Sequence, residues 1–181
     1  TLVDGTLTVT ATAVSITANN DSKTYGQTRA YGAGSTAFTS SGLQNGETIG
    51  SVTITASGGT AANAAVGSYN LTPSAATGGT FTASNYTITF NTGALTVSKA
   101  VLTVTADNQS RAYGVANPTF TAMIGGFVNG ETLATSGVTG SAALTTTAAG
   151  ASAIGGYAIT AALSSLAASN YSFTLVDGTL T

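Results

Sequence analysis

The chain has 181 residues, of which 110 are Thr, Ala, Gly or Ser, so few large apolar side chains are present to form a core. It has no His, Cys or Trp, which excludes Ser-His-Asp and Cys-His nucleophile systems and zinc sites built from His and Cys. Four Lys or Arg and six Asp or Glu give a net charge of −2. This balance leaves no basic surface for nucleic acid, and no segment reaches the ~18 apolar residues of a membrane span.

Apolar residues alternate with Thr or Ser over much of the chain, and this period-2 pattern predicts half-buried strands and little helix. In chain order we predict strands at 14–18, 37–40, 51–56, 68–72, 85–91, 94–98, 102–106, 119–124, 137–144, 157–161, 170–176 and 179–181. Short helical turns are predicted at 47–51 and 131–136, where a Glu follows Asn-Gly. The tracts of small residues at 57–65 and 145–153 are predicted to be loops.

Two strand pairs are predicted to form hairpins. The strands 85–91 and 94–98 are separated by Thr92-Gly93, and the last two strands are separated by Asp177-Gly178. Asp-Gly between alternating strands is a strong hairpin signal. Gly93 and Gly178 are therefore predicted to be hairpin turn residues.

The chain also repeats itself, with a period of roughly 86 residues. Residues 1–8 are identical to residues 174–181. We therefore expect residues 1–12 to be the tail strand of a preceding repeat, followed by one repeat at 13–99 and a second at 100–181. At the junction Leu95, Val97 and Val101 lie at odd positions, whereas Leu102, Val104 and Ala106 lie at even ones, which predicts a crossover of two or three residues between the repeats. The recurring motifs are Lys23-Thr24-Tyr25-Gly26 with Arg111-Ala112-Tyr113-Gly114, Asn45-Gly46-Glu47-Thr48 with Asn129-Gly130-Glu131-Thr132, Gly67-Ser68-Tyr69 with Gly155-Gly156-Tyr157, and Ser84-Asn85-Tyr86 with Ser169-Asn170-Tyr171.

In this order the motifs resemble the MBG-type repeat (YGX variety) of large bacterial surface adhesins, including filamentous-haemagglutinin-like exoproteins. The resemblance covers essentially the whole chain. It implies a mostly β fold of two tandem small domains, β-grasp-like or β-sandwich, in an elongated array. The role it implies is that of a stalk that projects a terminal binding region.

The motif residues are interpreted as structural. The tyrosines would cover core edges, and the Gly and Asn-Gly positions would form turns. Glu47 and Glu131 would sit in a first helical turn, with cation binding as the alternative. Arg111 replaces Lys23 in the second repeat, which excludes a Lys–Asn cross-link repeated at this position. The structural set is Tyr25, Gly26, Tyr113, Gly114, Asn45, Gly46, Asn129, Gly130, Tyr86, Tyr171, Gly93 and Gly178.

No catalytic, cofactor-binding or metal-binding residue is expected, with a calcium ion between repeats as the alternative. Glu47 and Glu131 occupy equivalent positions of different repeats, so we do not expect them to form a catalytic carboxylate pair. The function expected is a structural spacer of a large secreted adhesin at the bacterial cell surface, supporting adhesion or biofilm. Its partners would be neighbouring repeats, with a host or matrix receptor bound by other regions. The alternatives are a segment of an extracellular fibre that associates laterally, and a glycan-binding module that uses Tyr31, Tyr69 or Tyr157.

Overall fold

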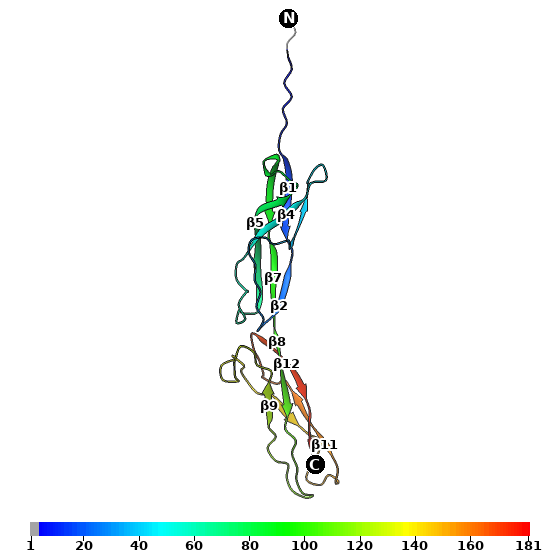
Figure 1. Cartoon of the computed structure of the whole chain (residues 1–181). Coiled ribbons are helices and arrows are strands. Elements are labelled where there is room, and N and C mark those ends of the chain that lie inside the picture. The colour runs from blue at the N-terminus through cyan, green and yellow to red at the C-terminus, as the bar shows by residue number, and fades with distance from the viewer. Residues whose placement is uncertain (1–3) are drawn as a thin grey trace. The chain divides into compact units, whose positions relative to one another are not determined.

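The computed structural model describes residues 4–181 (Figure 1). As predicted, the chain is mostly β, and the helical content of this part is a single short 3-10 helix. The described residues divide into two compact units. The first contains the residues up to Lys23 and Gln27–Val97, and the second contains Thr24–Gly26 and Ser98–Thr181. No helix among the described residues is long and apolar enough to span a membrane.

The first repeat folds into two sheets. Strand β1 lies at the centre of a three-stranded sheet of order β3-β1-β6, and the other sheet has the order β2-β7-β5-β4. The pairing of β1 with β6 is parallel, whereas β1–β3, β4–β5 and β5–β7 are antiparallel. The elements are β1 (Thr12–Ala18), β2 (Asp21–Thr24), β3 (Phe38–Ser41), β4 (Ile49–Ala56), β5 (Gly67–Gly79), η1 (Ala83–Asn85), β6 (Tyr86–Asn91) and β7 (Gly93–Ser98).

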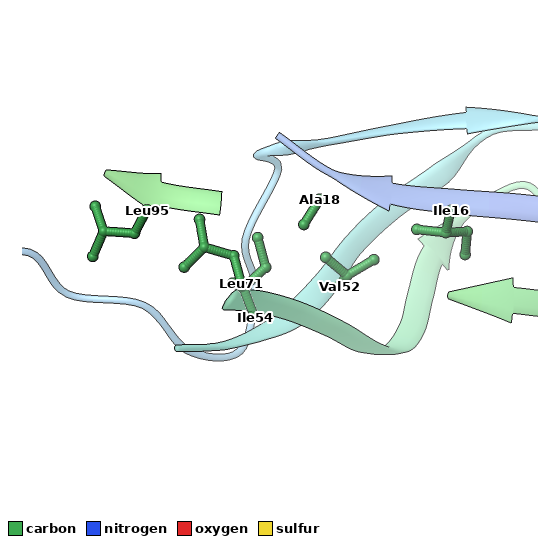
Figure 2. Packing of buried hydrophobic residues seen from close by; sticks show 6 residues of the cluster. All are labelled: Ile16, Ala18, Val52, Ile54, Leu71 and Leu95. Carbon is green, nitrogen blue, oxygen red and sulfur yellow. The ribbon is translucent and has the colours of Figure 1, made fainter. Parts of the chain in front are cut away.

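Strands from both of these sheets contribute to one hydrophobic core. Ile16 and Ala18 of β1 belong to one sheet, whereas the other core residues come from β4, β5 and β7 of the second sheet. Figure 2 shows these side chains between their ribbons, with Leu71 and Leu95 close together. The first unit is therefore a two-layer β structure. Its core cluster consists of Ile16, Ala18, Val52, Ile54, Leu71 and Leu95.

The second unit repeats this plan, and the strands of one of its two sheets are shorter than their counterparts. Strand β8 is central in a sheet of order β12-β8-β9, and β11 is central in a sheet of order β10-β11-β13. Where the first repeat has β2 beside β7, the second has only an isolated bridge between Gln109 and Leu180. The core cluster is Ala106, Ala148, Ile159, Ala161 and Leu180. The strands are β8 (Ala100–Ala106), β9 (Ala122–Gly125), β10 (Ala143–Thr145), β11 (Tyr157–Ala162), β12 (Tyr171–Val176) and β13 (Gly178–Leu180).

The two predicted hairpins are wrong. Strands β6 and β7 belong to different sheets, and so do β12 and β13. A single residue separates the strands of each pair, and the chain uses it to pass from one sheet to the other. Gly93 is needed for close approach, because a Cβ there would lie against the Ala18 carbonyl and 2.8 Å from that of Asn19. At Gly178 a Cβ would lie 2.7 Å from the Ala106 carbonyl oxygen.

Several predicted boundaries also need correction. Residues 47–51 do not form a helical turn, because β4 already begins at Ile49. At 131–136 a turn is present, and the Ser136 N–H donates to the Thr132 carbonyl at 2.9 Å. The strand predicted at 137–144 shortens to β10, and the one at 119–124 becomes β9.

The connection between β7 and β8 is a single residue, Lys99, shorter than the expected crossover of two or three. Burial changes parity across it, since Leu95 and Val97 are buried before it and Leu102 and Val104 after it. Residues 4–11 form no strand and are exposed, and residues 1–3 lie outside the described part. The assignment of 1–12 to a preceding repeat stays a prediction.

Candidate functional site

A glutamate and two tyrosines form a hydrogen-bonded polar group in the second unit. Glu131 follows a turn in which Asn129 and Gly130 both have positive φ, 57° and 71°. The Tyr171 hydroxyl, at the start of β12, donates to Glu131 Oε2 at 2.6 Å. The Tyr25 hydroxyl donates to Glu131 Oε1 at 2.5 Å. Each carboxylate oxygen thus accepts one charge-assisted hydrogen bond, the stronger class of such bonds.

These bonds and burial change how the tyrosines ionise. Burial, followed by the hydrogen bond to Glu131, raises the pKa of Tyr171 to about 12. The hydrogen bond to Glu131, followed by burial, raises the pKa of Tyr25. The side-chain amides of Asn129 and Asn170 also hydrogen-bond Tyr25 and oppose this rise. Both hydroxyls therefore keep the donating proton to a higher pH than an ordinary tyrosine does.

Apolar contacts complete the packing around Tyr171, which is 1% exposed. The rings of Tyr25 and Phe127 meet it edge to face, with centroids at 5.4 Å and 5.9 Å. Such edge-to-face pairs add about 0.5–1.5 kcal/mol beyond burial. Gly26 has φ +97° and packs against Val128, so that an added Cβ would lie 2.8 Å from the Val128 Cβ. This site thus accommodates a tyrosine followed by a glycine.

The first unit contains the same arrangement with one member fewer. The Tyr86 hydroxyl donates to Glu47 Oε2 at 2.6 Å, and this hydrogen bond raises the pKa of Tyr86. The Gln44 N–H donates to the Tyr86 oxygen at 3.0 Å, as the Val128 N–H does to the Tyr171 oxygen at 3.2 Å. Tyr86 is 8% exposed, more than its counterpart Tyr171.

A cavity lies beside this pair in the first unit. Its volume is about 380 Å³, and it is open to solvent. Among residues 4–181, no side chain donates to Glu47 Oε1, the oxygen equivalent to the one that receives the Tyr25 hydroxyl in the second unit. The lining residues are Val9, Thr10, Ala11, Thr12, Gln44, Asn45, Glu47, Ser84, Asn85 and Tyr86.

In both units, the cationic residue two positions before the Tyr-Gly pair binds loop carbonyls. The buried Lys23 ammonium donates to the carbonyls of Gln27, at 2.7 Å, and Ala61. Arg111 donates to the carbonyl of Ala149 and to Asn117 Oδ1, the latter at 2.7 Å. Lys and Arg can exchange here because both act as donors to carbonyl oxygens. The small-residue tracts around 61 and 149 are thereby attached to the rest of their units.

The three tyrosines considered for ligand contact all bond within their own units. The Tyr69 hydroxyl donates to the Ala65 carbonyl at 2.9 Å, and the Tyr157 hydroxyl donates to the Ala153 carbonyl at 3.0 Å. The Tyr31 hydroxyl donates to Asp21 Oδ2 at 2.8 Å, and burial with this bond raises its pKa to about 12. The structure does not bring the three together at one site. A small pocket is lined by Tyr157, Tyr113 and Arg111, whereas Tyr31 lines a separate one.

Asp21 forms a second polar cluster in the first unit. Arg29 Nε lies 3.2 Å from Asp21 Oδ2, and the Ser22 N–H donates to Oδ1 at 2.7 Å. Burial raises the pKa of Asp21, but the hydrogen bonds from Tyr31 and Ser22 and the charge of Arg29 outweigh it and lower that pKa. The sequence analysis did not identify this cluster.

The predicted motif residues have different environments in the two repeats. Tyr25 is 4% exposed, whereas its counterpart Tyr113 is 70% exposed. The turn glycines Gly26 and Gly114 both have positive φ, as do Gly46 and Gly130.

The bonds from Glu47 and Glu131 to tyrosines about 40 residues later were missed. The available signal was that Asn-Gly-Glu and Ser-Asn-Tyr recur together in both repeats. Within residues 4–181, no three Asp or Glu side chains gather as a metal site would require.

Comparison with known proteins supports the repeat organisation. No curated protein and no solved structure matches the chain. The family model of the MBG domain (YGX type) matches residues 14–96 and, separately, residues 102–181. Together these two matches span most of the sequence. The chain therefore belongs to the MBG domain (YGX type) family and carries two tandem copies of that domain.

Proposed function

We propose that the two domains are spacer repeats of a secreted bacterial surface adhesin, with a structural rather than catalytic role. The observation that carries this proposal is the tandem pair of MBG domains of the YGX type. This family is consistent with repeat domains of surface proteins. The one-residue connection through Lys99 leaves no room for a flexible linker between β7 and β8.

The use of the polar side chains also supports a structural role. Glu131 binds two tyrosines, Glu47 binds one, and Lys23 and Arg111 bind loop carbonyls. Asp21 accepts hydrogen bonds from Tyr31 and Arg29. These side chains thus hold the fold, while one carboxylate oxygen of Glu47 receives no donor among residues 4–181. A spacer needs folded units that keep their structure, and these bonds supply that.

Surface display tests the proposal. The 181-residue chain is placed in one, two or three copies between a membrane anchor and an epitope on intact bacteria. A spacer predicts that antibody access to the epitope increases with each copy, because each copy moves the epitope farther from the surface polysaccharide. Access that does not change with copy number would contradict the proposal.

A glycan array addresses the binding alternative with the same chain. A spacer predicts no specific hit. A reproducible hit that is lost in Tyr69→Ala or Tyr157→Ala, while the melting temperature stays unchanged, would favour a glycan-binding module. Proteins with both changes would serve as the matched negative control.

A further inference from the structure

The cavity beside Glu47 is lined by residues equivalent to those that surround Tyr25 in the second unit. In the second unit, Tyr25 is bound by Glu131, Tyr171, Asn129 and Asn170. The repeat places Glu47, Tyr86, Asn45 and Asn85 at the matching positions of the first unit, and all four line the cavity. The polar residues that bind the Tyr-Gly turn in the second unit are thus present in the first, where Leu43 and Gln44 stand in place of Phe127 and Val128.

The hydrogen bonds of the two sites agree in detail. In both units a tyrosine hydroxyl donates to one glutamate oxygen at 2.6 Å and accepts a backbone N–H from the residue three positions before that glutamate. The second glutamate oxygen receives Tyr25 in the second unit. In the first unit, that oxygen of Glu47 has no donor among the described residues.

A matching Tyr-Gly turn is exposed elsewhere on the chain. Tyr113 and Gly114 are the equivalents of Tyr25 and Gly26, and the φ of Gly114 is +83° against +97° for Gly26. Tyr113 is 70% exposed and the following Val115 is 53% exposed. Nothing lies within 4 Å of a Cβ added at Gly114, whereas Gly26 packs on Val128. The turn therefore shares the positive glycine φ of Tyr25-Gly26 and exposes its tyrosine, and its Gly114 N–H donates to the Gly150 carbonyl at 3.1 Å.

We propose that the cavity formed by Gln44, Asn45, Glu47, Asn85 and Tyr86 binds the Tyr113-Gly114 turn of a second copy of this chain. The Tyr113 hydroxyl donates to Glu47 Oε1, and its ring packs edge to face on Tyr86. Gly114 approaches Gln44 as Gly26 approaches Val128. The contact joins two different surfaces, so it is heterologous and extends into open chains of copies. The inference goes beyond the proposed function, since a spacer can also be monomeric.

Sedimentation velocity over a range of concentrations tests the association. The wild-type chain is expected to show a weight-average sedimentation coefficient that rises with concentration and passes the dimer value. Tyr113→Phe removes only the hydroxyl of an exposed side chain, so its fold should be unchanged. The loss of a hydrogen bond to a charged group should weaken association about tenfold or more. Tyr69→Phe, outside the cavity, is the matched control and should associate like wild type.

Mixing two variants gives the sharper result. Tyr113→Ala keeps the cavity but has no turn tyrosine, and Glu47→Gln keeps the turn but presents an amide in place of the free carboxylate oxygen. Each alone should be monomeric, and an equimolar mixture should form a one-to-one dimer that does not grow further. Circular dichroism and melting check that both variants fold.

Three results would overturn the proposal. The wild-type chain could remain monomeric up to about 1 mM, the weakest affinity worth considering here. Association could persist at full strength in Tyr113→Phe. The mixture of variants could fail to dimerise although both are folded.

Discussion

The two domains share their motifs, and in both a Glu is bonded to a Tyr, but the remaining contacts of that Glu differ. In the second unit Glu131 accepts hydroxyls from both Tyr171 and Tyr25, and Tyr171 is 1% exposed. In the first, Glu47 accepts only Tyr86, which is 8% exposed. A buried site thus depends on a Tyr-Gly turn that lies far away in sequence.

The units differ in their sheets as well. Strand β5 has 13 residues in the first unit, whereas its counterpart β11 has 6, and β2 is reduced to an isolated bridge. The positions of the Gly, Tyr and Glu motifs are nevertheless kept. Strand length thus varies between the repeats, whereas residues with several close partners keep their positions.

The largest effect is expected at the glycines of the sheet crossing. Gly93→Ala should lower the stability of the first unit by about 3 kcal/mol or more, because the new Cβ meets backbone oxygens that cannot move aside. Gly178→Ala should cost the second unit less, since its contacts are slightly longer. Denaturant unfolding measures both variants, with hydrogen exchange assigning each effect to a unit.

Gly32→Ala and Gly125→Ala are matched controls, since nothing lies within 4 Å of a Cβ at either position. Both should change stability by less than about 0.5 kcal/mol. Equal effects at Gly93 and Gly32 would contradict the crossing geometry.

The next comparison is between the two strand-initiating tyrosines. Tyr171→Phe should cost the second unit about 1.5–3 kcal/mol, because it removes a buried hydrogen bond to a charged group. Tyr86→Phe should cost the first unit less, since water reaches Tyr86 more readily. Thermal unfolding of the two variants measures the difference. A larger loss in Tyr86→Phe would reverse this ranking of the two sites.

The loop cations should show a smaller difference. Lys23→Met leaves the carbonyls of Gln27 and Ala61 without this donor and should cost about 1–3 kcal/mol. Arg111→Met should cost less, because Arg111 is more exposed than Lys23. Hydrogen exchange in the loops 57–65 and 145–153 should accelerate in the respective variant alone. Unchanged exchange in both would show that these bonds do not fasten the loops.

At alkaline pH a response is expected from the buried tyrosines. Tyr171 in the second unit and Tyr31 in the first have a pKa of about 12, against about 10 in an unfolded chain. Between these values the unfolded chain has lost the proton and the folded one keeps it. Stability should therefore be fully present below pH 10 and fall as pH rises toward 12.

Unfolding measured from pH 8 to 12 tests this expectation. Tyr171→Phe should flatten the loss in the second unit, and Tyr31→Phe should flatten it in the first. Because the pKa values of Tyr25 and Tyr86 are also raised, part of the dependence of stability on pH should remain in each unit. Identical slopes in wild type and variants would show that these hydroxyls are not responsible.

The sequence predicted most strands because alternation is a local property of each segment. It predicted hairpins wrongly at Gly93 and Gly178, because the same Gly-containing spacing serves both a hairpin turn and a crossing between sheets. A hairpin turn and a sheet crossing are distinguished only by the backbone that packs against the glycine. That backbone belongs to β1 or β8, which is distant in sequence. The turns at Asn45-Gly46 and Asn129-Gly130 were predicted, since positive φ is a local property.

The candidate site was less accessible from sequence. Its tyrosines and glutamates all lie in recurring motifs, but the hydrogen bonds between them were not predicted. Glu47 and Glu131 were assigned to helical turns because a Glu after Asn-Gly is locally suited to one. Their tyrosine partners are about 40 residues away or, for Tyr25, 106. Local propensity carries no information on contacts of that separation.

Glu131 holds the Tyr25 and Tyr171 hydroxyls together. A double-mutant cycle with Tyr25→Phe, Glu131→Gln and the combined variant measures the coupling between Tyr25 and Glu131 directly. The hydrogen bond at 2.5 Å predicts a favourable coupling free energy of about 1–3 kcal/mol. A coupling of zero within error, with all variants folded, would contradict the claim.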